Sequence, residues 1–175
     1  SRHILGVAPV RFSGFEPLLF SEIEVQNIRR ILGGQSLTLD QATKANVLER
    51  ISAYRVLHFS THAQAESGLP FIAFRDTNLY LPEIYSLEVG AEMIALSACE
   101  TLVGDSRKGE GVMSLARAFQ YIGVPSLAAS LWNVPDKSTQ VIMTQFYENL
   151  AAGMPKDQAL REAKLSYLDK QETSY

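Results

Sequence analysis

Cysteine is almost absent from this chain: Cys99 is the only one among 175 residues. A single cysteine excludes an intrachain disulfide, a CxxC redox pair and a multi-cysteine zinc site. The thiol is therefore structural, reactive, or available only to another molecule. A chain without disulfides is also the kind that the reducing cytoplasm holds, so we expect a cytoplasmic location.

Long apolar runs and an excess of one charge are lacking as well. The most apolar stretch, residues 122–132, is interrupted by Gly123 and Pro125 and is far shorter than the ~20 residues of a membrane-spanning helix. The chain has 16 Lys and Arg and 19 Asp and Glu, which gives a net charge of −3, and its basic residues form no stripe along the sequence. We therefore expect neither membrane insertion nor direct nucleic-acid binding.

What the chain does have is enough apolar material for a core, with 46% hydrophobic and 20% charged residues. Its length suits one domain over residues 1–175, and because it begins with Ser1 rather than Met we expect a piece of a larger protein. β-type runs alternate with amphipathic segments, which predicts an α/β fold with a mostly parallel sheet and helices on both faces.

The predicted elements follow from hydrophobic periodicity and turn residues. Strands are expected at residues 3–10, 36–39, 54–60, 93–98 and 126–132, a hairpin or small flap at 69–81, and helices at 18–32, 40–51, 112–121, from 135 and from 155. In the first helix, Leu19, Ile23 and Ile28 are expected on the apolar stripe.

Two residues with nucleophilic chemistry lie at predicted strand ends. His62 follows the third strand and Cys99 follows the fourth, and the carboxyl ends of parallel strands form the edge where α/β proteins place their sites. A thiol with a nearby imidazole can carry out acyl transfer, because the base raises the thiolate fraction and handles the proton. The alternative is that Cys99 is a small buried hydrophobe and His62 an ordinary polar residue.

Other site chemistries fit the sequence less well. His58 and His62 are four residues apart on a predicted strand, roughly 13 Å and too far to share a metal, so His58 is interpreted as a core histidine. The sequence has no GxSxG elbow, no GxxxxGK[ST] loop and no GxGxxG turn. We expect no metal and no cofactor.

Five sequence segments, in their order along the chain, resemble the CHAT family of caspase-like domains, which are often attached to tetratricopeptide repeats. The matching segments are VLHFSTHA (56–63), IALSACET (94–101), GEGVMSLARAFQYIGVPSLAASLWNVPD (109–136), STQVIMTQFYENLAAG (138–153) and QALREAKLSYL (158–168). The resemblance implies a three-layer caspase-haemoglobinase-like fold and a cysteine endopeptidase that hydrolyses peptide bonds. It also implies regulation by an attached repeat domain or an activating partner protein.

The resemblance further assigns roles to individual residues. His62 and Cys99 would be the catalytic dyad, and the backbone N–H groups of Ala63 and Cys99 would form the oxyanion hole. Glycine is common in the family where this chain has Ala63, so a site that needs positive φ would be strained there. A catalytically weak or inactive interaction module with the same fold, and acyl transfer to an acceptor other than water, stay open as alternatives.

Substrate selectivity is expected to involve the end of the fifth strand. Trp132 lies on that strand and Asp136 follows it, so a carboxylate could line the pocket for the residue before the cleaved bond. This predicts a preference for a basic side chain. The competing interpretation of Asp136 is a helix cap.

Overall fold

The computed structural model describes residues 4–66, 68–98, 110–131 and 134–172. Its strands are β1 (Ile4–Ala8), β2 (Gly34–Thr38), β3 (Val56–Glu66), β4 (Leu69–Ala73), β5 (Asn78–Tyr80), β6 (Met93–Ala98) and β7 (Leu127–Ala129). Its α-helices are α1 (Ser21–Leu32), α2 (Lys44–Arg50), α3 (Leu81–Ile84), α4 (Glu110–Tyr121), α5 (Asp136–Ala151) and α6 (Lys156–Glu172).

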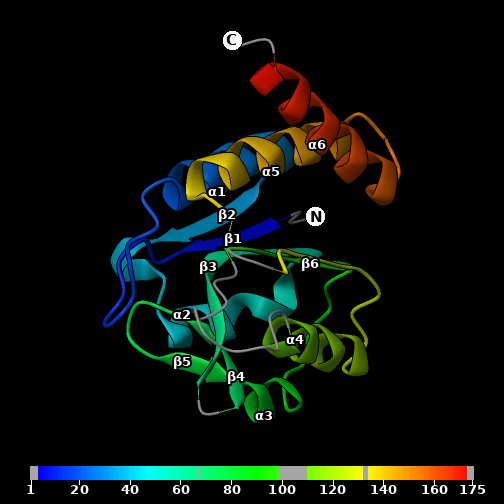
Figure 1. Cartoon of the computed structure of the whole chain (residues 1–175). Coiled ribbons are helices and arrows are strands. Elements are labelled where there is room, and N and C mark those ends of the chain that lie inside the picture. Colours follow the sequence, from blue (N-terminus) through cyan, green and yellow to red (C-terminus); the bar gives the residue numbers. More distant parts are fainter. Residues whose placement is uncertain (1–3, 67, 99–109, 132–133, 173–175) are drawn as a thin grey trace.

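The sheet is mostly parallel, as the alternation of strands and helices predicts. Parallel pairing gives the strand order β2-β1-β3-β6-β7, and the β4–β5 hairpin joins antiparallel to the second half of β3. Helices α1, α5 and α6 cover one face, and α2, α3 and α4 lie on the other (Figure 1). This is the three-layer α/β arrangement expected from the resemblance.

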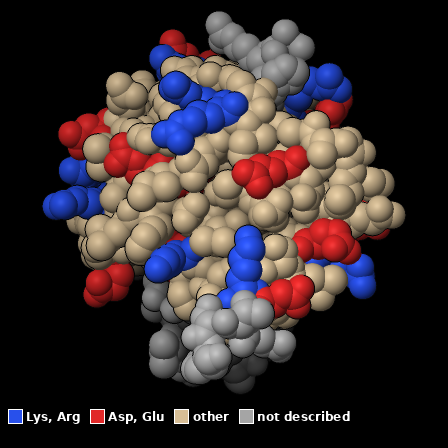
Figure 2. Space-filling model, turned by 90° about the horizontal axis from the view of Figure 1, so that it is seen from above, with Lys and Arg blue, Asp and Glu red and all other residues tan. Residues whose placement is uncertain are grey.

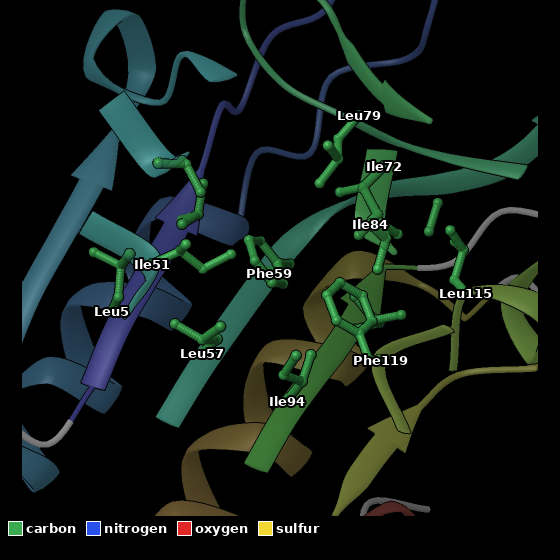
Figure 3. Packing of buried hydrophobic residues seen from close by; sticks show 14 of the residues in the cluster. Leu5, Ile51, Leu57, Phe59, Ile72, Leu79, Ile84, Ile94, Leu115 and Phe119 are labelled. Carbon is green, nitrogen blue, oxygen red and sulfur yellow. The ribbon is translucent and has the colours of Figure 1, made fainter. Parts of the chain in front are cut away.

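Each face of the sheet has its own apolar core. On the α2/α3/α4 side, Leu57 and Phe59 of β3 and Ile94 of β6 point into one layer with Phe119 of α4 (Figure 3). On the other side a smaller cluster joins the sheet to Phe146 and other residues of α5 and α6. Burying a side chain of this size contributes about 1.5–3 kcal/mol, so these layers hold the strand ends in place.

Helix α1 is turned differently from the predicted stripe. Ile23 is 48% exposed, and the buried residues of the helix are Ser21, Glu24, Val25 and Ile28. Gly6 of β1 explains how closely the helix approaches, because a Cβ there would lie 2.9 Å from Val25 Cβ. The correction matters for the site, since it places the carboxylate of Glu24 inside the protein.

Strands β3 and β7 differ most in length from the sequence prediction. Strand β3 continues past Ser60 to Glu66, so His62 lies within a strand and not after one. The extension is held by antiparallel pairing with β4, in which Ala63 faces Ile72. Strand β7 is shorter than predicted and ends at Ala129. Strand β6 has the predicted bounds, and the β4–β5 hairpin confirms the predicted flap.

Within the described ranges, none of the helices combines the length and the apolar character that crossing a bilayer requires.

Candidate functional site

His62 lies at an irregularity in the pairing of β3 with β6. Phe59 pairs with Leu96 and the next pair is His62 with Ala98, so three steps on β3 correspond to two on β6. A bulge of this kind re-aims side chains and is common beside active sites. His62 is therefore the ladder partner of the residue that precedes Cys99 in the chain. Cys99 itself lies outside the described residues.

A segment from the amino-terminal part of the chain covers the imidazole. The ring of His62 lies 4.6 Å from that of Phe12 and 5.4 Å from that of Phe15, measured between centroids. Its Nε2 donates to the main-chain carbonyl of Glu16 over 2.8 Å. The segment is closed on itself by a bond of 2.8 Å from Leu18 N–H to the carbonyl of Val10. Only 2% of His62 remains exposed.

This hydrogen bond defines the tautomer of the neutral ring. A carbonyl oxygen only accepts, so Nε2 carries a hydrogen, and Nδ1 is the nitrogen that can take up a proton. The sequence could not indicate the cover, because Phe12 and Phe15 lie in a stretch without helix or strand periodicity.

Asp136 lies at the first position of α5 and binds the chain just after the covering segment, which runs from Val10 to Leu18. Its Oδ2 accepts from the backbone N–H of Phe20 over 2.6 Å. Burial raises the pKa of the Asp136 carboxyl, and the Glu24 carboxylate adds to this, whereas the Phe20 N–H and His62 lower it. Asp136 therefore lies near enough to His62 for the two side chains to interact electrostatically. Trp132, the other predicted substrate residue, lies outside the described residues.

Ala63 is compatible with its place in β3. Among the described residues other than glycine, positive φ occurs at Val10 and Leu39, so Ala63 carries no left-handed strain. Its methyl is buried in the α2/α3/α4 core, where a glycine would leave a gap. The backbone at this position therefore does not require glycine, and alanine is accommodated without strain.

A buried polar network connects β3 and β6 with helices α1 and α5. Glu24 Oε1 accepts from His58 Nε2 and from Ser97 Oγ, each over 2.6 Å, and His58 Nδ1 lies 3.0 Å from the Tyr147 hydroxyl. Glu24, His58 and Tyr147 are fully buried. His58 is thus a core histidine, as predicted. Burial and the Glu24 carboxylate hold the pKa of the Tyr147 hydroxyl well above its ordinary value.

The network was missed at the level of sequence. Glu24 is four residues before Ile28 on the buried stripe of α1, and a carboxylate in that position was the available signal. Its Oε2 has no hydrogen-bond partner among the described residues. Burying this carboxylate therefore costs free energy of folding, which the hydrogen bonds to Oε1 must offset.

The donor set gives no metal centre in the described part of the chain. No group of three or more His, Cys, Asp or Glu residues there is arranged to hold an ion.

The surface over α1, α5 and α6 carries basic and acidic side chains interspersed with uncharged residues (Figure 2).

Comparison with known proteins agrees with the fold. A sequence model of the CHAT domain matches residues 3–175. Tetratricopeptide repeat protein 28 of Homo sapiens is 25% identical, and its namesake in Mus musculus is 21% identical. Each alignment covers 84% of this chain and 8% of the relative, so the chain spans less than a tenth of these curated relatives. Because the family match runs over almost all of the sequence, the chain belongs to the CHAT domain family.

Proposed function

We propose that this chain is a cysteine endopeptidase domain in which His62 and Cys99 form the catalytic dyad. The observation that carries the proposal is the pairing of His62 with Ala98, the last residue of β6. Neighbouring strands are about 4.8 Å apart, and a trans peptide separates consecutive Cα atoms by about 3.8 Å. The next residue in the sequence after Ala98 is Cys99, which supports a position of its thiol near the imidazole of His62.

The chemistry follows from these two groups. The imidazole takes the thiol proton, and the thiolate sulfur attacks the carbonyl carbon of the peptide bond. The resulting oxyanion is held by the backbone N–H groups of Ala63 and Cys99. The C–N bond then breaks as the imidazolium gives its proton to the leaving amine. Water hydrolyses the thioester and regenerates the thiol.

Regulation and location complete the proposal. The relatives are tetratricopeptide repeat proteins by name, and the 2% exposure of His62 means that a substrate needs the covering segment to move. An attached repeat domain or an activating partner would supply that movement in the cytoplasm. No cofactor takes part in the reaction.

The same cover favours a second candidate function. A histidine held by a main-chain carbonyl and two aromatic rings is also what a non-catalytic interaction module would contain. In that case the fold would present a surface to a partner, and the dyad residues would have structural roles only.

A comparison of His62→Ala and Cys99→Ala with the wild-type protein separates the two functions. The full-length protein is incubated with a peptide library, and each variant is expected to reduce cleavage by about 10³-fold or more. Circular dichroism establishes that the variants are folded. Equal cleavage by all three proteins would refute the dyad.

Labelling of Cys99 by iodoacetamide gives a second readout, followed by mass spectrometry of the peptide that contains it. A thiol activated by His62 reacts faster than free cysteine at pH 7, and His62→Ala removes the difference. A rate equal to that of free cysteine in both proteins would favour the interaction module.

A further inference from the structure

A cavity of about 200 Å³ lies beside the carboxyl ends of β6 and β7, between the sheet and helices α5 and α6. Its walls are mostly apolar and include Leu131, Ile142, Met143 and Leu160, with Ser97 and Lys164 among the few polar residues. An engineered apolar cavity of about 150 Å³ is large enough for benzene. The space therefore accommodates a side chain of the size of Leu, Met or Phe.

The cavity borders the candidate site through β6. This strand lies between β3, which carries His62, and β7, which forms a wall of the cavity. Ser97 lines the cavity and precedes Cys99 by two residues, a reach of at most about 7 Å. A peptide whose carbonyl is held at the end of β6 thus has the cavity on one side and the imidazole on the other.

The lining chemistry selects against a basic side chain. Among the described residues of the lining, the charged one is Lys164 and none is a carboxylate. A Lys or Arg side chain entering this space would meet a like charge and lose its hydration without gaining a partner. An apolar side chain would instead remove apolar surface from water on both sides of the contact.

We propose that this cavity receives the side chain of the substrate residue on the amino side of the cleaved bond and selects an apolar side chain of the size of Leu, Met or Phe there. The inference rests on the proposed peptidase function. It opposes the basic preference expected from Asp136, a residue that does not line the cavity and whose Oδ2 is bonded to the Phe20 N–H.

Peptide binding tests the cavity without requiring catalysis. Fluorescently labelled peptides that differ only in a carboxyl-terminal Leu, Met, Lys or Asp are titrated into the full-length Cys99→Ala protein and followed by anisotropy. We expect the Leu and Met peptides to bind at least about tenfold tighter than the Lys peptide, the factor that 1.4 kcal/mol represents. Equal affinities, or tightest binding of the Lys or the Asp peptide, would overturn the proposal.

Variants of the lining locate the effect. Ala128→Phe fills the cavity from β7 and is expected to abolish the preference for Leu, whereas Leu160→Ala enlarges it and is expected to shift the preference from Leu to Phe. Leu165→Ala, on the same helix but 39% exposed and outside the lining, is the matched control and leaves the preference unchanged. If Ala128→Phe does not fold, Leu160→Ala still decides the question.

Cleavage by the wild-type protein keeps the two proposals apart. Apolar-selective binding without any Cys99-dependent cleavage would support the cavity and contradict the peptidase. Cys99-dependent cleavage with no selectivity in binding would support the peptidase and contradict the cavity.

Discussion

His62 Nε2 donates to the main-chain carbonyl of Glu16, a residue 46 positions earlier in the chain, over 2.8 Å. This bond and the rings of Phe12 and Phe15 fix the imidazole before any substrate arrives. The segment that orients the ring is also the one that shields it, so loosening the segment should expose His62 while leaving the sheet intact.

Phe15→Ala is expected to speed hydrogen–deuterium exchange at C2 of His62. The variant removes an aromatic contact with His62 and another with Phe71 of β4, at a centroid distance of 5.9 Å, so the segment opens more often. We expect a rate about threefold higher or more, measured by mass spectrometry, because local opening limits access to a buried group. His58 is the internal control, since its contacts are with Glu24 and Tyr147. An unchanged His62 rate would show that Phe15 is not part of the cover.

Asp136→Ala and Asp136→Asn are expected to differ in stability. Alanine leaves the Phe20 N–H without its acceptor and should lower the free energy of unfolding by about 1 kcal/mol at pH 7. Asparagine keeps an acceptor oxygen and removes a half-buried charge, so it should stay within about 0.5 kcal/mol of the wild type. Urea unfolding measures both.

The pH dependence of the same pair has a definite sign. The folded-state pKa of Asp136 is raised, so the folded protein holds this proton more tightly than the unfolded chain. Its stabilising effect is complete below the unfolded pKa, about 3.9, and is lost as the pH rises through the folded pKa. The stability of the wild type relative to Asp136→Asn should therefore increase as the pH falls through the raised folded-state pKa toward the unfolded one. A constant difference would contradict the raised pKa.

Glu24→Ala is expected to destabilise the protein by about 3 kcal/mol or more. It leaves the buried N–H of His58 and the hydroxyl of Ser97 without their shared acceptor. Glu24→Gln retains an acceptor and should cost less. Glu22→Ala, on the same helix but partly exposed, should stay within about 0.5 kcal/mol. Similar losses for Glu22→Ala and Glu24→Ala in urea unfolding would exclude a special role for the network.

The sequence predicts those features that depend on local pattern. The almost continuous apolar run at 93–98 predicts the bounds of β6, because a strand covered on both faces has few polar residues, here Ser97 alone. The extension of β3 beyond Ser60 could not be predicted, since its polar residues are held by antiparallel pairing with β4. The rotation of α1 depends on Gly6 and Val25, which meet only after folding.

The candidate site divides in the same way. The sequence predicts that His62 approaches the end of β6, because topology brings carboxyl ends of parallel strands together, but His62 lies within β3 and not at its end. The Phe12 and Phe15 cover and the carbonyl of Glu16 were not, because main-chain acceptors and irregular segments leave no periodic signal. The partners of Glu24 are also far away in sequence, at separations of 34 and 73 residues.

Tyr147→Phe is expected to change how stability responds to alkaline pH. Burial and the Glu24 carboxylate raise the pKa of Tyr147 well above its ordinary value, so above about pH 10 the unfolded chain loses this proton while the folded protein retains it. Because the folded state then binds more protons, the free energy of unfolding falls as the pH rises, by up to about 1.4 kcal/mol per pH unit from this group. The phenylalanine variant lacks that contribution and should lose stability less steeply between pH 10 and 11. At pH 7 it should be about 1 kcal/mol less stable than the wild type, because the hydroxyl next to His58 Nδ1 is gone. Tyr121→Phe, at a position 79% exposed, is the matched control and should follow the wild-type curve in urea unfolding at each pH. Parallel curves for Tyr147→Phe and the wild type would contradict the raised pKa.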